Sequence, residues 1–440
     1  MAALTERGRF GISLGLERVA RLMSDAGNPE RALRGALVAG TNGKGSVVAM
    51  VRSVLNAAGL RVGTMPKPHL VSYRERIAID GEPLSAEDFA AAVARVLPAI
   101  DRVAAEIGPP TEFEALTAAA IAELARRQID LAVVEVGMGG RLDATNVLDL
   151  GVAVITNVQR DHERYLGRTL AAIGGEKAAI IKTDNLAVTG ASGRGLRPVL
   201  DRCAALGVPL RRAGPRQAYR ADLLEAGWDG IVIDAVTPGG SLRELHIGLL
   251  GEHQAQNAAV ALAVLDALHD DGERRGEALT LDEEAVRRGM AGVRWSGRLE
   301  LLNAAHLGLG RVLLDGAHNP AGAAALAAAL RELGLRQPAL VLGAMRGKRI
   351  HALLRALAPL EPRPVFTRVD DAGALPPATL LHAWRRVAPG AHPGRTAATP
   401  HEALTMAAGM RRGDQPIVVA GSLYLVGAVR GIITGEREEG

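Results

Sequence analysis

The feature that most constrains this chain is a short glycine-rich segment, Gly40-Thr41-Asn42-Gly43-Lys44-Gly45-Ser46. Residues 36–39, just before it, form an apolar run that predicts a buried strand, and residues 47–58 show the periodicity of an amphipathic helix. Glycines let the backbone turn tightly, so successive amide N–H groups can converge on one anion, and the following helix adds the positive end of its dipole. The segment therefore predicts a phosphate-binding loop.

Two side chains of this loop suit a nucleotide. Lys44 would supply a mobile cation for the outer phosphates, and Ser46 would hydrogen-bond a phosphate oxygen or ligate Mg²⁺. The spacing is two residues shorter than in the common G-x-x-x-x-G-K-[ST] loop. On this pattern alone a generic Gly/Ser turn stays an alternative, so the surrounding sequence has to decide.

Composition narrows the class of protein. A chain of 440 residues exceeds one ordinary core, and we expect two domains, residues 1–295 and residues 296–440. The net charge of +4 could suit nucleic acid, but an aromatic content of only 2% leaves little for base stacking, so we expect no nucleic-acid partner. The single cysteine, Cys203, excludes an internal disulfide and indicates a reducing cytoplasm. Because no uninterrupted apolar run reaches about 18 residues, we expect no membrane segment.

Apolar runs alternate with helical patterns along the first part of the chain. The runs are 37–39, 131–136 and 152–157, and the helical patterns are 47–58, 117–127 and 170–181. This alternation predicts an α/β fold with a largely parallel sheet, whose loops at the carboxyl ends of the strands bind the nucleotide. Near Trp295 the alternation begins again. Residues 311–315, 339–342 and 416–420 predict strands and residues 321–333 predict a helix, which together indicate a smaller second α/β domain. Residues 190–198, 237–241 and 388–394 are Pro- and Gly-rich and predict surface loops.

Three further clusters follow predicted strands. Glu135 ends an otherwise apolar run, where a carboxylate is costly to bury unless it binds a cation; the alternative is a partner for a buried arginine or backbone N–H. His162 lies just past the next run and could ligate a metal, although a lone histidine is more often structural. Glu176-Lys177 alone predicts only a charged turn that opens a helix.

Taken in order, eight motifs make the chain similar to a known family: GTNGKGS, PHL with ERI, EVGMGGRLDATN, DH with LG, EKA, HQAQNAA, WSGR and DGAHNP. The chain resembles the folylpolyglutamate synthase and dihydrofolate synthase family of Mur ligases, from Phe10 to about Arg430. The resemblance implies an N-terminal P-loop ATPase domain with a mostly parallel sheet, a smaller C-terminal α/β domain, and a substrate cleft between them.

The implied activity is ATP-dependent amide ligation, which adds L-glutamate to dihydropteroate, to reduced folates, or to both. An acyl phosphate would be the intermediate, and ADP and phosphate would be released. The implied cofactors are ATP and two Mg²⁺ ions, and the implied protein is a cytoplasmic monomer with small-molecule substrates. A paralogous Mur-type ligase with another acid or amine is the alternative. A nucleotide switch would need the loop but not Glu135, His162 and a modified Lys177.

The resemblance also implies roles for individual residues. The nucleotide would be bound by Thr41, Asn42, Gly43, Lys44, Gly45, Ser46, Asn257, Arg298, Asp315 and His318. The metals would be held by Ser46, Glu135, His162 and Lys177, the last as a carbamate. The catalytic set would be Lys44, Glu135, His162 and Lys177, and the substrate would meet His69, Arg141 and Asp143.

Three departures from the family pattern concern the substrates, and one of them is Leu375-Pro376-Pro377-Ala378, which stands where members of the family often carry Pro-Arg-Ala. Lys67 stands where the family usually has a serine that helps hold Mg²⁺; a charged ammonium cannot ligate a metal but can act as a cation there. Gly347-Lys348-Arg349 replaces the usual Asp-Lys-Asp, so the amine substrate stays open. We also expect Lys44→Ala to abolish ligation and to leave the fold intact, because a loop lysine faces solvent and packs little.

Overall fold

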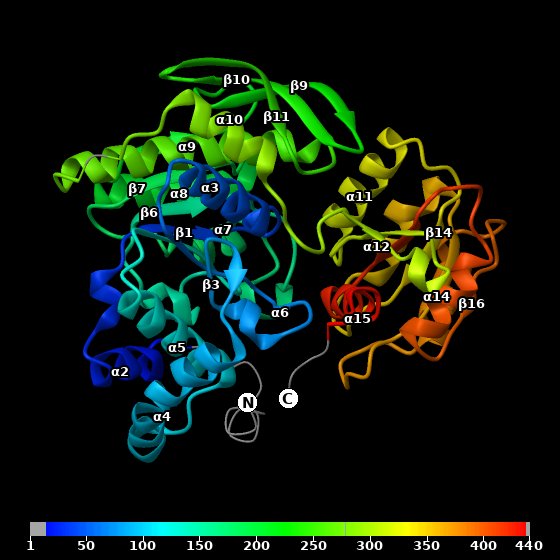
Figure 1. Cartoon of the computed structure of the whole chain (residues 1–440), viewed down its shortest axis with the longest axis horizontal. Coiled ribbons are helices and arrows are strands. Elements are labelled where there is room, and N and C mark those ends of the chain that lie inside the picture. Colours follow the sequence, from blue (N-terminus) through cyan, green and yellow to red (C-terminus); the bar gives the residue numbers. More distant parts are fainter. Residues whose placement is uncertain (1–14, 278, 437–440) are drawn as a thin grey trace.

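The computed structural model describes residues 15–277 and 279–436, and Figure 1 shows them as a larger body in blue to green beside a smaller body in yellow to red. Phe10, where the family resemblance begins, lies outside the described residues. In the part of the chain that is described, every helix is too short or too polar to cross a bilayer. The α/β class expected from the sequence is confirmed.

The larger body is built on an eight-stranded sheet with the order β4-β3-β2-β5-β1-β6-β7-β8. Its strands are β1 (Gly35–Ala39), β2 (Val62–Met65), β3 (Ala78–Ile79), β4 (Glu82–Pro83), β5 (Leu131–Glu135), β6 (Gly151–Ile155), β7 (Leu186–Thr189) and β8 (Leu210–Arg212). From β2 to β8 every neighbouring pair is parallel, and only β3 and β4 add antiparallel edges. The predicted parallel sheet is therefore confirmed.

Helices cover both faces of this sheet (Figure 1). The helices of the larger body are α2 (Glu17–Asp25), α3 (Lys44–Ala57), α4 (Ala86–Ile107), α5 (Glu112–Arg126), α6 (Glu163–Leu166), α7 (Leu170–Ala178), α8 (Gly193–Leu206), α9 (His253–Arg274) and α10 (Glu283–Gly292), and α10 packs on α3 rather than on the sheet. Successive residues of a strand face opposite sides, and β1 shows this directly, because Ala36 and Val38 join the core under α3 and α9 whereas Leu37 and Ala39 join the core under α4 and α5. Burial on both faces explains the continuous apolar run at 36–39.

A three-stranded antiparallel sheet, absent from the sequence-based expectation, covers α9. It consists of β9 (Arg220–Gly227), β10 (Gly230–Thr237) and β11 (Gly240–Ile247), and it lies at the top of Figure 1. β10 alternates buried and partly exposed residues along most of its length, whereas β9 has no buried residue. The weak pattern of β9 explains why this sheet was not predicted.

The smaller body has a six-stranded sheet with the order β12-β13-β17-β14-β15-β16, parallel except for β12. Its strands are β12 (Glu300–Asn303), β13 (Arg311–Leu314), β14 (Ala339–Leu342), β15 (Arg363–Phe366), β16 (Arg395–Thr396) and β17 (Ile417–Ala420). Its helices are α11 (Pro320–Glu332), α12 (Ile350–Leu357), α13 (Pro377–Val387), α14 (Pro400–Ala408) and α15 (Leu423–Thr434). Short 3-10 helices occur in both bodies. The larger body has η1 (Pro29–Ala32), η2 (Tyr73–Arg76) and η3 (Ala144–Val147), and the smaller body has η4 (Ala305–Leu307) and η5 (Ala358–Leu360). The domain boundary at 295/296 stays a prediction.

Two local expectations were wrong. Residues 190–198 were expected to form a loop, but α8 begins at Gly193 and includes Pro198 in its second turn, where the proline removes one backbone N–H donor from the helix. Glu176-Lys177 was expected to open a helix, but both residues lie in the last turn of α7. The expected loop at 388–394 is confirmed. Of the expected loop 237–241 only Pro238 and Gly239 form the turn, and the other residues belong to β10 and β11.

One glycine determines how the two bodies meet. Gly427 lies on α15, and a Cβ at this position would overlap the carbonyl oxygen of Leu70 in the larger body. The segment that contains Leu70 continues into η2 and places Arg76 at the central cavity. The close approach of α15 to this segment therefore requires glycine.

We predict that Gly427→Ala destabilises the protein by about 1–3 kcal/mol, because α15 must move away from Leu70 to make room for the methyl group. Denaturant unfolding measures the loss. Gly409→Ala is the matched control, because its Cβ would meet only an ordinary contact, 3.6 Å from the oxygen of Met406. Equal stability of the two variants would contradict the packing argument.

Candidate active site

The carboxyl ends of three neighbouring strands meet at one cavity of about 1100 Å³. The segment 40–46 follows β1, Glu135 ends β5, and residues 156–162 follow β6. Val38 of β1 is in register with Glu135, so the glycine-rich segment begins directly beside this carboxylate. Residues of the smaller body, among them Arg298 and His318, complete the lining.

Backbone and side-chain hydrogen bonds fix the glycine-rich segment on the end of β6. The N–H of Thr41 donates to the carbonyl of Asn157 at 3.2 Å, and the N–H of Asn42 donates to the side-chain oxygen of the same residue at 3.0 Å. Thr156 returns a bond from its hydroxyl to the carbonyl of Asn42 at 2.7 Å. Gly45 is needed for close approach, since a Cβ there would lie 2.6 Å from Nε1 of Trp295. The loop is therefore held rigidly before any ligand arrives.

The start of α3 has the properties of an anion site. Its N-cap is Gly43 with φ 79°, and no side chain in the described residues caps it. The first N–H groups of a helix have no partner within the helix, so those of Lys44, Gly45 and Ser46 are available to an anion in the cavity. This geometry supports the phosphate-binding interpretation of the loop over a generic turn.

The sequence placed Lys44 in a loop and predicted that it faces solvent, and this prediction was wrong. It is the first residue of α3, its side chain is 16% exposed, and its Nζ lies 3.6 Å from Oε1 of Glu135. It also donates to the carbonyl of Gly40 at 3.3 Å. The ammonium is therefore held over the end of β5, where a phosphate on the loop would meet it.

Glu135 is a buried carboxylate with cations on several sides. Burial raises its pKa, and the charges of Lys44, Arg298 and Lys67 oppose that shift. Both interpretations of the sequence thus keep support, because the carboxylate pairs with a basic group and also lines the cavity as an oxygen donor for a cation.

Lys177 is buried at the other side of the loop. Its Nζ donates to the carbonyl of Gly40 at 2.9 Å, and its side chain lines the same cavity as Lys44. Burial, followed by the charge of Lys44, lowers the pKa of Lys177 to about 7. A large share of this amine is consequently neutral and nucleophilic at neutral pH.

Asp161 is a residue that the sequence analysis missed as a functional group. Its carboxylate accepts hydrogen bonds from Nζ of Lys348 at 2.8 Å and from Nδ2 of Asn319 at 3.1 Å, and it lies 3.3 Å from Nε2 of His318. Burial alone would raise the pKa of Asp161, but the bond from His318 and the charge of Lys348 hold it well below its usual range. One carboxylate at the end of β6 thus binds three side chains of the smaller body.

His162 follows Asp161 and lines the cavity with φ 49°, as the N-cap of α6. Partial desolvation, of a side chain that stays 41% exposed, and the charge of Lys348 lower the pKa of His162, which favours the neutral imidazole at neutral pH. A neutral imidazole is the form that can ligate a metal.

The expected nucleotide residues outside the loop also line the cavity. Asn257 of α9 receives no bond from the loop but lies against Gly43, and its amide donates to Gln254 at 2.8 Å. Arg298 donates to the carbonyl of Gly297 at 3.1 Å. Both carboxylate oxygens of Asp315 accept backbone N–H groups, from Leu299 at 3.0 Å and from Ala317 at 2.9 Å, so this aspartate shapes the turn after β13.

The three expected substrate residues differ in position. Asp143 lines the cavity, and its oxygens accept the N–H groups of Met138 at 2.8 Å and Thr145 at 3.0 Å. His69 does not belong to the lining; its Nδ1 accepts a bond from Nε of Arg76 at 2.9 Å, and Arg76 reaches the cavity instead. Arg141 also lies outside the lining.

Arg141 pairs with Glu176 at 2.9 Å on the exposed side of α7. Cys203, for which no activating neighbour was evident from the sequence, is buried, and burial raises the pKa of its thiol to about 11. Neither side chain takes part in the cavity.

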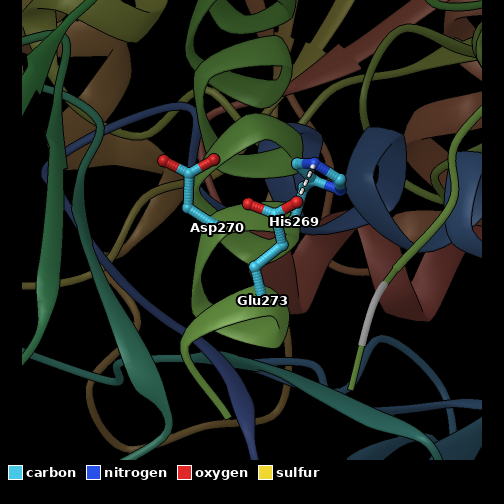
Figure 2. Close-up of side chains that lie close together, drawn as sticks. All are labelled: His269, Asp270 and Glu273. Carbon is cyan, nitrogen blue, oxygen red and sulfur yellow. Dashed lines mark ion pairs between the residues drawn. The ribbon is translucent and has the colours of Figure 1, made fainter. Parts of the chain in front are cut away.

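A second cluster of metal-ligating side chains lies away from the cavity, near the end of α9 (Figure 2). His269, Asp270 and Glu273 offer ligand atoms within 4.8 Å of one another. Asp270, however, accepts a bond from Arg211, and Nδ1 of His269 lies 2.6 Å from the carbonyl oxygen of Leu279. Figure 2 marks the His269–Glu273 ion pair at 3.5 Å. These protein partners account for the cluster, and we assign no site to it.

Comparison with protein-family models matches residues 38–265 to the Mur ligase middle domain and residues 302–432 to the C-terminal domain of dihydrofolate synthetase. Together with the nucleotide-type cavity between two α/β bodies, these matches define the chain as a Mur-type ligase, an ATP-dependent enzyme.

Individual relatives agree. A dihydrofolate synthase/folylpolyglutamate synthase of Mycobacterium tuberculosis is 37% identical, covering 94% of this chain and 89% of the relative, and one of Bacillus subtilis is 31% identical, covering 96% of each. The structure of Mycobacterium tuberculosis folylpolyglutamate synthase complexed with ADP has a TM-score of 0.87 at 34% identity, covering 98% of this chain and 96% of that one. Escherichia coli FolC in complex with DHPP and ADP has a TM-score of 0.85 at 28% identity, covering 99% and 96%. The chain belongs to the dihydrofolate synthase/folylpolyglutamate synthase family.

We predict that Lys44→Ala lowers kcat for ADP release by about 100-fold or more, because it removes a preorganised cation from the phosphate loop. It also leaves the buried carboxylate of Glu135 without its nearest ammonium, so a loss of stability accompanies the loss of turnover, in contrast to the intact fold expected from the sequence. Steady-state ADP release and thermal unfolding, measured on the same preparation, separate the two effects. Turnover equal to that of the unmutated enzyme would show that the loop is only structural.

Proposed function

We propose that this protein uses ATP to join L-glutamate to dihydropteroate, to reduced folates, or to both. The observation that carries the proposal is the single cavity in which a phosphate-type loop, a buried carboxylate and cations from the second body face one another. The ADP and DHPP in the structures of relatives support nucleotide and small-molecule substrates at such a cavity.

The reaction has two steps. A carboxylate oxygen of the acid bonds to the γ-phosphorus of ATP as the bond to ADP breaks, which gives an acyl phosphate. The amine nitrogen of glutamate then bonds to the acyl carbon, the nitrogen loses a proton, and inorganic phosphate leaves. Alignment of the reacting groups and neutralisation of charge are the main requirements of such a transfer.

Residues of this chain supply that neutralisation. The N–H groups at the start of α3 and the ammonium of Lys44 meet the phosphates, while Arg298 adds a cation from the smaller body. Because these groups are held in place before the reaction, they stabilise the transition state without reorganising. Enclosure between two bodies keeps water from the acyl phosphate.

We further propose that Mg²⁺ binds among Ser46, Glu135 and His162. The donor set fits, because a hydroxyl and a buried carboxylate are oxygen ligands of the kind Mg²⁺ prefers, and the imidazole of His162 is neutral. The ion would supply Lewis acidity at the phosphate oxygens. A monomeric enzyme is part of the same proposal.

Lys177 fits the carbamate expected from the family resemblance. Carbamate formation needs a neutral amine, and the buried ammonium of Lys177, with its pKa lowered to about 7, loses its proton readily. The amine nitrogen bonds to the carbon of CO₂ and releases one proton, which turns a cation into an anionic oxygen ligand. The lysine would then join Glu135 as a metal ligand.

We predict that intact protein prepared with bicarbonate carries the added mass of CO₂ on the peptide with Lys177, and that Lys177→Ala abolishes both the added mass and ligation. Native mass spectrometry and ADP release measure the two. Lys182→Ala is the matched control, since its ammonium donates to carbonyls outside the cavity, among them that of Asn146 at 2.9 Å. An unmodified Lys177 in active, bicarbonate-supplied enzyme would refute the carbamate.

A panel of acids and amines tests the function itself. We expect ADP release with dihydropteroate and L-glutamate, with reduced folates and L-glutamate, or with both pairs, and none when either component is omitted. Chromatography of the product identifies the amide. ADP release only with another acid or amine would favour the paralogous ligase and reject the folate assignment.

A further inference from the structure

Lys67 carries a buried ammonium that forms no ion pair with the described residues. It follows β2 and lines the cavity, and its Nζ lies 3.9 Å from the ring centroid of Phe113. This Nζ is closed off from solvent, and it has no hydrogen-bond partner in residues 15–277 and 279–436. A buried polar group without a partner is rare in folded proteins and calls for a physical explanation.

The carboxylates nearest to Lys67 are already engaged. Both oxygens of Asp143 accept backbone N–H groups, and Glu135 lies beside Lys44. The face of Phe113 replaces only part of the hydration that the ammonium has given up. Burial accordingly lowers the pKa of Lys67 to about 8, against the opposing charge of Asp143. The cavity thus holds a cation whose protein environment does not balance it.

The position of Lys67 indicates which anion its ammonium would bind, a phosphate or a carboxylate. The charges of Lys44 and Glu135, at the loop that takes the phosphates, act on its ammonium, and so does the charge of Asp143, which follows β5; Phe113, whose ring lies under the ammonium, comes from α5. A carboxylic acid that attacks the γ-phosphate has to place its carboxylate beside this loop. Lys44 already serves the phosphates, so the carboxylate is the anion left to Lys67.

We propose that the ammonium of Lys67 turns from the ring of Phe113 to the carboxylate of the acid substrate and holds that carboxylate against the γ-phosphate. This inference rests on the proposed function and names a residue that decides which acids are accepted. Lysine suits the role because its ammonium is a compact charge on a flexible stem. The ammonium offsets part of the repulsion between the carboxylate and the polyphosphate.

Binding measurements with a matched pair of ligands test this role. The ligands are dihydropteroate and the same molecule with its carboxylate converted to a carboxamide, titrated by calorimetry into ADP-loaded enzyme. The unmutated enzyme should bind the carboxylate about 10- to 100-fold more tightly than the carboxamide, as expected for a charge-assisted hydrogen bond. Lys67→Met and Lys67→Gln should lose this preference and bind the carboxamide with unchanged affinity.

Arg52→Met is the matched control. Arg52 is another basic residue of the larger body whose buried Nε has no hydrogen-bond partner in the part of the chain that the structure describes, and Arg52 lies outside the cavity lining. This variant should keep the full preference for the carboxylate. Unchanged ADP affinity in every variant establishes that the nucleotide site is folded.

Other results would overturn the proposal in distinct ways. Equal loss of affinity for carboxylate and carboxamide in both Lys67 variants would mean that Lys67 only packs the wall. If the Lys67 variants bound the ATP analogue AMPPCP more weakly but kept their affinities for ADP and dihydropteroate, Lys67 would be assigned to the γ-phosphate. Preference retained in both variants, together with normal ligation by the unmutated enzyme, would reject the role of Lys67 and leave the proposed function standing. If the unmutated enzyme binds neither ligand, both proposals fail.

Discussion

The site depends on three enclosed lysine side chains that line the cavity beside the carboxyl ends of β1, β2 and β5. Lys44, Lys67 and Lys177 converge there on a cavity in which Glu135 is the nearest acidic side chain to Lys44. Burial lowers the pKa values of Lys67 and Lys177, and Lys44 adds to both shifts. Buried charges of one sign are costly unless anions balance them. A polyphosphate and a carboxylate are two such anions. The buried cations therefore favour binding of both reactants.

The same sheet edge joins the two bodies. Asp161 lies just beyond β6 and binds Lys348, His318 and Asn319, while Asn42 of the phosphate loop accepts a bond from the amide of Asn319 at 3.0 Å. The loop that would receive the phosphates is thereby in direct contact with the body that would close over them. Nucleotide binding and the approach of the two bodies are consequently coupled through a few short hydrogen bonds.

The sequence predicted the parts of this site that depend on local pattern. The apolar run 36–39, the glycines after it and Glu135 at the end of another run each identify a strand and its carboxyl end without reference to distant residues. The partners of Asp161 could not be predicted in this way, because Lys348 lies 187 positions further along the chain. The same holds for Gly427, whose requirement arises only when α15 packs on Leu70.

For two residues, the position predicted from residue type was wrong, because tertiary contacts hold the side chain elsewhere. Lys44 in a loop suggested exposure, but the loop folds back on β5 and encloses the side chain. His69 suggested a substrate contact, yet its ring accepts a bond from Arg76 and so positions the guanidinium that reaches the cavity. Lys44 lines the cavity as expected but is enclosed rather than exposed, whereas His69 lies outside the lining and acts on the cavity through Arg76.

The basic segment 347–349 shows how a departure from the family pattern is accommodated. The sequence suggested that loss of two acidic residues here alters recognition of the amine. In the structure Lys348 binds Asp161 at 2.8 Å, and Nη1 of Arg349 lies 3.9 Å from Oε1 of Glu163. Two cations of the smaller body thus face two anions at the start of α6. Acidic residues at 347 and 349 would add negative charge opposite Asp161 and Glu163, whereas glycine and arginine avoid that repulsion. In this chain, charge complementarity between the bodies accounts for the segment independently of the amine.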